Sequence, residues 1–116
     1  MSHQYQGVLD ALTRVRGVQG AMFVAREDGL AIADALMEGV RGKALGALAA
    51  SAFSRYAAVS RAIEAGAPRF FQLQCKKGVV LVVAAGGEVL VVVVADAAAN
   101  IGLIRLEMLR AAEVFA

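Results

Sequence analysis

The chain has few of the residues on which enzyme chemistry usually depends. Its 116 residues include one histidine, His3, one cysteine, Cys75, and no tryptophan. The one histidine lies at the N-terminus, where the chain is expected to fray, so neither a catalytic triad nor a zinc site built on histidine is expected. Cys75 cannot close an internal disulfide, and an apolar edge-strand residue is a simpler interpretation than a reactive nucleophile. Glycine-rich phosphate loops are absent too. We therefore expect no catalytic residue, no metal site and no cofactor, and predict that the protein is not an enzyme.

Charge of either sign is sparse and scattered. Twelve Lys and Arg balance ten Asp and Glu, and no basic stripe alternates with aromatic residues, so no nucleic-acid surface is expected. Residues 79–95 are nearly all apolar, at the lower limit for a spanning helix. Gly86, Gly87 and Glu88 in their middle favour two strands joined by a turn. The start, MSHQYQ, does not resemble a signal peptide. We expect no membrane insertion and a cytoplasmic location.

Apolar residues, in contrast, are in excess. Hydrophobic residues make up 59% of the chain, whereas an average domain has about 45–50% even with glycine counted. Residues 1–116 form one domain, which buries only about two thirds of its unfolded surface. A very well-packed monomer would explain the excess, but we favour an apolar patch that a second subunit covers.

Hydrophobic spacing and turn residues divide the chain into eight elements. Helices are predicted over residues 4–16, 43–65 and from about 100 to the end, with Asp96 or Asn100 as the last N-cap. Strands are predicted over residues 20–26, 30–35, 69–76, 79–85 and 89–95. The last three strands are joined by tight turns and must be antiparallel. The order α-β-β-α-β-β-β-α predicts an α+β sandwich: a five-stranded antiparallel sheet with one long helix on one face and two on the other.

The helix predicted over residues 43–65 has small residues all round and few charges. Its stripe of larger apolar side chains is expected to pack on the sheet: Leu45, Leu48, Ala52, Tyr56, Val59 and Ile63. The adjacent flank, with Phe53 as a knob, is expected to pack on another helix. An ordinary alanine-rich surface helix is the alternative. In the last helix, Leu103, Leu106 and Val114 lie off the core stripe and are expected to contact the first helix.

Several features, taken in order, resemble the Roadblock family of dynein light chain and MglB-like domains. They are Gly17-Val18-Gln19-Gly20-Ala21 before the first strand, Asp28-Gly29-Leu30 in the first hairpin, the alanine-rich middle helix, the three-strand meander, and Asp96 with Asn100, Gly102, Leu103 and Arg105. Each is weak alone, but their order and spacing are fairly specific and span nearly the whole chain. The resemblance implies a homodimer in which the middle helices pair and the third strands meet to extend the sheet.

Members of this family bind other proteins. MglB-like members stimulate GTP hydrolysis by a Ras-like GTPase whose own residues they reposition, and eukaryotic relatives are dynein light chains or GTPase scaffolds. The resemblance therefore implies a non-catalytic homodimeric module that binds and regulates a small Ras-like GTPase by a population shift. An arginine finger is the sharper alternative. A small-ligand sensor domain is the second hypothesis, and it would need a pocket of several hundred cubic ångströms with convergent polar groups.

These hypotheses assign residues to two surfaces. The expected dimer interface comprises Gly46, Ala50, Phe53, Ser54, Ala57, Phe71, Leu73 and Cys75. In residues 69–76, apolar and polar side chains alternate, as in a half-exposed edge strand. Arg55 and Arg61 are the predicted GTPase contacts, although solvated charges would explain both. Replacing Phe53 with Glu is predicted to break the dimer, because it would bury an unpaired charge.

Overall fold

The computed structural model describes residues 2–115, with side chains from residue 4 onward, so the side chain of His3 lies outside the description. The eight elements are α1 (Ser2–Thr13), β1 (Val18–Ala25), β2 (Ala31–Leu36), α2 (Gly42–Ala62), β3 (Phe70–Gln74), β4 (Gly78–Ala85), β5 (Val89–Asp96) and α3 (Ile101–Val114). The predicted order and fold class are confirmed. The end of β4 and the start of β5 match the prediction, and the other described boundaries lie within three residues of it. Helix and strand ends depend on local hydrogen bonding more than on hydrophobic spacing.

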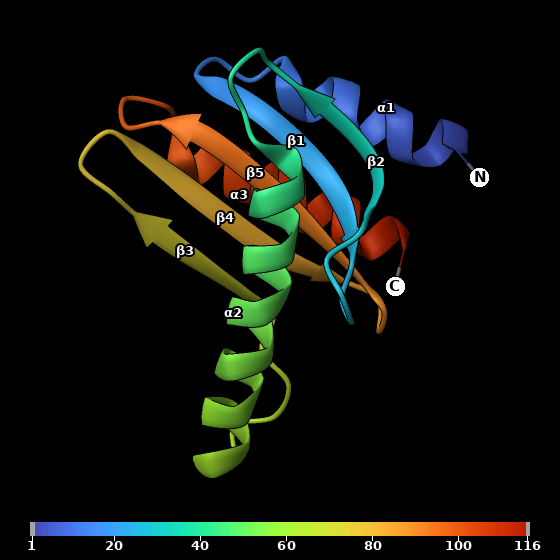
Figure 1. Ribbon diagram of the computed structural model, residues 1–116, viewed down its shortest axis with the longest axis vertical. Coiled ribbons are helices and arrows are strands. Elements are labelled where there is room, and N and C mark those ends of the chain that lie inside the picture. The colour runs from blue at the N-terminus through green and yellow to red at the C-terminus, as the bar shows by residue number, and fades with distance from the viewer. Residues whose placement is uncertain (1, 116) are drawn as a thin grey trace.

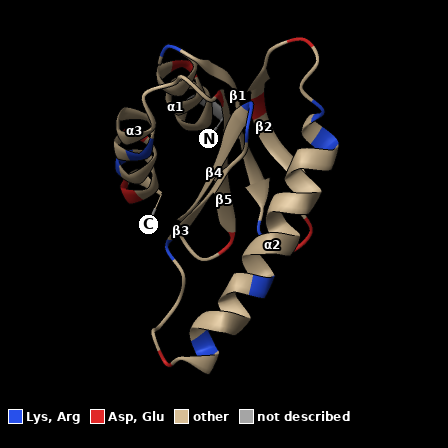
Figure 2. Ribbon diagram, turned by 90° about the vertical axis from the view of Figure 1, so that its left-hand side faces the viewer, with Lys and Arg blue, Asp and Glu red and all other residues tan. Residues whose placement is uncertain are grey.

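All five strands form one antiparallel sheet in the order β2-β1-β5-β4-β3. Helix α2 lies on one face of the sheet, and α1 and α3 lie on the other (Figures 1 and 2). The most apolar strands, β5 and β4, are inside the sheet and buried on both faces, as their unbroken valine runs predict. The edge strands β2 and β3 are shorter and more exposed.

The larger core lies between the sheet and the pair α1 and α3. Leu9 and Leu12 of α1 and Ile104 and Met108 of α3 are fully buried against alternate residues of β1, β4 and β5. One end of this layer is closed by three aromatic rings, Tyr5, Phe23 and Phe115, whose centroids lie 4.6 to 5.2 Å apart. The first and last helices thus each bury one apolar face against the sheet.

The start of α3 distinguishes the two predicted N-cap residues. The backbone N–H of Leu103 donates to Asn100 Oδ1 at 3.1 Å, so Asn100 is the N-cap. Asp96 instead accepts from the N–H of Ala98 at 2.9 Å and closes the preceding turn. Leu103 and Leu106, predicted to contact α1, are 41% and 45% exposed and are not buried between the two helices. The hollow between the two helices is lined on α3 only from Glu107 onward, and Val114 is the one predicted residue that lines it.

The second core is smaller and lies beneath α2. Phe53 and Ala49 of the helix pack on Met22, Val24 and Val92 of the sheet. The helix comes very close to the first hairpin, because a Cβ on Gly46 would lie 2.5 Å from the carbonyl oxygen of Gly29. Gly29 has a φ of +77°, a conformation that favours glycine. Two glycines that meet backbone to backbone therefore set the distance between α2 and the sheet.

Candidate functional site

The face of α2 that packs on the sheet is not the predicted one. Phe53 is 1% exposed, and the other buried residues of the helix are Gly46, Ala49, Ala50 and Ala57. The bulky stripe is exposed instead, at 69% for Leu48, 45% for Tyr56, 57% for Val59 and 67% for Ile63. The close approach of the two backbones explains this, since the narrow space under α2 admits small side chains and a single ring.

This exchange of faces corrects two predictions. Of the predicted stripe, Leu48, Val59 and Ile63 do not pack on the sheet of their own chain. Leu45 packs on the second core, and Tyr56 contacts Phe71 of β3. Four residues expected at the dimer interface, Gly46, Ala50, Phe53 and Ala57, are buried within one protomer and offer little surface to a second copy. Ser54 is exposed but belongs to the opposite flank of the helix, next to the first hairpin.

The exposed stripe continues from α2 onto the edge of the sheet. The rings of Tyr56 and Phe71 meet edge to face, with centroids 4.8 Å apart. Leu73 is 54% exposed, Phe71 is half-buried, and Cys75 lies exposed just beyond the end of β3. The second half of α2 extends past the end of the sheet (Figure 1). We call the continuous surface formed by Leu48, Ala52, Tyr56, Val59, Ile63, Phe71 and Leu73 the apolar stripe.

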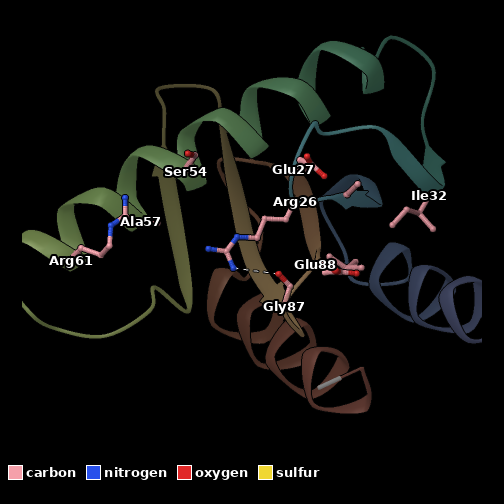
Figure 3. Close-up of a pocket in the computed structure, with 10 residues that line it drawn as sticks. Arg26, Glu27, Ile32, Ser54, Ala57, Arg61, Gly87 and Glu88 are labelled. Carbon is pink, nitrogen blue, oxygen red and sulfur yellow. Dashed lines mark hydrogen bonds between the residues drawn. The ribbon is translucent and has the colours of Figure 1, made fainter.

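A groove runs along the other flank of α2, between this helix and the turns β1–β2 and β4–β5 (Figure 3). It consists of two adjoining cavities of about 650 and 630 Å³. Both cavities are lined by Arg26 from the end of β1 and by Ala57 and Arg61 from α2. Glu27 and Glu88 line one cavity, and Glu64 lines the other. We call this feature the arginine groove.

The two predicted GTPase contacts lie in different places. Arg61 lines the arginine groove, whereas Arg55 lines a neighbouring hollow of about 490 Å³ that shares Glu27 and Ser54 with the groove. Both arginines are exposed. Sequence reasoning missed Arg26 entirely, because a single arginine before an Asp-Gly turn carries no pattern. Its position becomes informative only once the fold brings Gly87 and Phe53 beside it.

Two further features of residues 2–115 concern metal binding and membrane spanning. No group of three or more His, Cys, Asp or Glu is placed to hold a metal ion in this part of the chain. Within the same residues, no helix is long and apolar enough to cross a membrane.

Comparison with known proteins identifies the family. Residues 5–95 match the Roadblock/LC7 domain. Two uncharacterized proteins of Methanocaldococcus jannaschii, MJ1340 and MJ0714, are 39% and 40% identical to the chain over 106 residues. Those residues are 91% of this chain and 91% and 88% of the two relatives.

Solved structures agree with this assignment. Gliding protein mglB from Thermus thermophilus superposes with a TM-score of 0.88 at 23% identity, covering 98% of this chain and 87% of that one. An MglB with tetrameric arrangement gives 0.87 at 25% identity, covering 97% and 88%. Myxococcus xanthus MglB gives 0.86 at 20% identity, covering 97% and 91%. With its α-β-β-α-β-β-β-α order, single antiparallel sheet and these matches, the chain belongs to the Roadblock/LC7 domain family.

Proposed function

We propose that this protein is a non-catalytic homodimeric module that binds and regulates a small Ras-like GTPase. Family membership supports the class of function, and the likeness to MglB structures supports the fold on which such regulation is built. The observation that carries the proposal is the apolar stripe. Leu48, Val59 and Ile63 each expose more than half of their surface on one side of a single helix. A contiguous apolar surface of this kind favours a protein partner.

The stripe lies beside a free sheet edge. Strand β3 pairs only with β4, so one side of its backbone is unpaired along residues 70–74. Because Tyr56 touches Phe71, the helix stripe and this edge face the same side of the molecule. A second copy related by a two-fold axis would cover both at once, α2 against α2 and β3 against β3, and extend the sheet. The stripe thus replaces the four buried residues in the proposed interface.

We expect Val59→Glu to convert the dimer into monomers. Val59 lies in the middle of the stripe, and each protomer would bring one carboxylate into an apolar contact that offers it no partner. The dissociation constant of the dimer should rise about a hundredfold or more, since the energetic costs of the two buried carboxylates add. Sedimentation velocity across a concentration series measures it directly.

The matched control is Ala58→Glu. It introduces the same charge one residue away, at an exposed position of α2 outside the stripe, and should leave the dissociation constant within a few fold. A wild-type protein that sediments as a monomer at about 100 μM would contradict the proposed dimer, as would equal effects of the two substitutions.

The GTPase contact is testable with purified partners. We expect the dimer to bind a Ras-like GTPase of the same genome, beginning with any encoded beside this gene, in one nucleotide state in preference to the other. If Arg55 and Arg61 are rim contacts, replacing either with Ala should weaken binding by about three- to tenfold, with little change in the hydrolysis rate of the saturated complex. An arginine finger would behave differently, because its loss lowers hydrolysis by about a thousandfold or more.

Fluorescence anisotropy of labelled GTPase and phosphate release measure the two quantities. Failure of every Ras-like GTPase of that genome to bind at about 100 μM dimer would refute the proposal. One observation supports the second hypothesis, a small-ligand sensor. The arginine groove has the size and the polar lining that such a function requires.

A further inference from the structure

In the arginine groove, the guanidinium group of Arg26 is held in place but makes few hydrogen bonds. Arg26 lies over the ring of Phe53, with its Cζ 4.7 Å from the ring centroid. Its Nη1 donates to the carbonyl oxygen of Gly87 at 3.4 Å, and its backbone N–H donates to Glu88 O at 2.8 Å. Since Phe53 is fully buried, the ring is a fixed platform. Stacking on a ring restrains the guanidinium plane and leaves its N–H edges free to form hydrogen bonds.

Most of the N–H donors of the Arg26 side chain are not used in hydrogen bonds. A guanidinium has five N–H donors, and the side-chain hydrogen bonds found within residues 4–115 use only one from Arg26, at long range. Over the same residues the one ion pair joins Arg110 to Glu107, so neither Glu27 nor Glu88 neutralises Arg26. A restrained, half-buried arginine without a carboxylate partner faces the groove.

The Arg26 guanidinium is turned away from Glu27 and Glu88. It extends from the turn after β1 toward the part of α2 that carries Arg61, whereas Glu27 and Glu88 lie in the opposite direction (Figure 3). Glu64 lines the second cavity with Arg61. Arg61 and the exposed hydroxyl of Ser54 complete the lining of the basic end on the helix side. Two guanidinium groups and a hydroxyl that line one cavity are suited to the oxygens of a phosphate or a carboxylate.

We propose that the basic end of the arginine groove, formed by Arg26, Arg61 and Ser54, binds the phosphate or carboxylate group of a small molecule. Arg26 supplies a fixed fork of N–H donors, and Arg61 closes on the same oxyanion from α2. The combined volume of the groove is large enough for the rest of a metabolite-sized ligand. This inference does not rest on the proposed GTPase function.

The groove is also independent of the proposed dimer. Arg61 follows Val59 by two residues, and at about 100° per residue this places it on the far side of the helix from the stripe. The groove should therefore remain open when the stripe is covered. Val59→Glu should leave anion binding unchanged, so a failure of the dimer proposal and a failure of this one are distinguishable.

The test is titration of the purified wild-type protein with inorganic phosphate, pyrophosphate and succinate at constant ionic strength. Chemical shifts of backbone amides, read by NMR, should change saturably at Arg26, Ala57 and Gly87. Saturation by phosphate and pyrophosphate alone identifies a phosphate site, and saturation by succinate alone identifies a carboxylate site. No saturable change up to about 10 mM of any probe would overturn the proposal, because a 1 mM site would then be nearly full.

Two variants locate the binding. Arg61→Gln removes one guanidinium from an exposed position and should weaken binding about tenfold. Arg26→Lys keeps the charge but loses the fork, and should weaken it by a similar factor. Arg55→Gln is the matched control, an exposed arginine of the same helix that does not line the groove, and should leave the affinity for the anion unchanged. Equal affinities of Arg61→Gln and the wild type would overturn the assignment even if Arg26→Lys failed to fold.

Discussion

Replacing Phe53 with alanine should lower the free energy of unfolding by about 3–5 kcal/mol. The ring is the largest buried side chain of α2 and fills the space between this helix and Met22, Val24 and Val92. Its loss opens a cavity that the small neighbours of the helix cannot refill, and it also removes the surface on which Arg26 stacks. Urea unfolding followed by circular dichroism, at one fixed protein concentration, measures the change.

The control for Phe53 is Arg55→Ala, an exposed change two residues along the same helix, which should shift stability by less than about 0.5 kcal/mol. A small effect of Phe53→Ala would contradict the assignment of this face to the core. The structure also corrects the expected outcome for Phe53→Glu: it would bury a charge inside one protomer and unfold the domain, rather than separate two folded copies.

Replacing Gly46 with valine should cost about 3 kcal/mol of unfolding free energy, at the upper end of typical overpacking effects. The new Cβ would lie 2.5 Å from the carbonyl oxygen of Gly29 and 3.1 Å from a methyl group of Val24. The first obstacle is main chain, so no side-chain rotation relieves it and α2 must move away from the sheet. Thermal unfolding detects the loss.

Gly7→Val tests whether the cost comes from the site rather than from valine in a helix. Gly7 is in α1, is exposed, and has no atom within 4 Å of its virtual Cβ. Valine has a slightly higher helix propensity than glycine, so this variant should be neutral or slightly stabilised. If the two variants lost equal stability, the close contact of Gly29 and Gly46 would not be what positions α2.

The sequence predicts the secondary structure well, because most elements carry an unambiguous period. Because Gly86 and Gly87 separate the valine runs of β4 and β5, these runs are predicted as two strands joined by a turn. The order of the elements then leaves few topologies, and the family resemblance selects one. Asn100 was predictable as a cap, but choosing it over Asp96 required the hydrogen bond to Leu103.

The orientation of α2 was not predictable in the same way. The expectation that large apolar side chains are buried places Leu48, Val59 and Ile63 against the sheet. That rule fails for a helix whose own sheet lies too close for them. Only the contact of Gly46 with Gly29 reveals this, and these two residues are 17 positions apart.

The arginine groove was beyond sequence analysis for a related reason. Arg26 and Gly87, which form its hydrogen bond, are 61 residues apart in the chain, and Arg61 belongs to a third segment. None of the three stands in a recognisable motif. Sites assembled by tertiary contact from isolated residues carry no local pattern, whereas strands and helices do.

The two margins of the sheet are chemically unequal, and this limits how large an assembly can grow. Strand β3 presents Leu73 at its border, whereas β2 carries an exposed Asp34 and pairs with β1 through an irregular register near Val24. Were β3 of one molecule to join β2 of the next, the contact would repeat without end and produce a fibre. In the proposed dimer, pairing of β3 with β3 leaves no free β3 edge. Further pairing at β2 is disfavoured by the exposed carboxylate of Asp34 and the register shift near Val24, although Ile32 is exposed on the same strand.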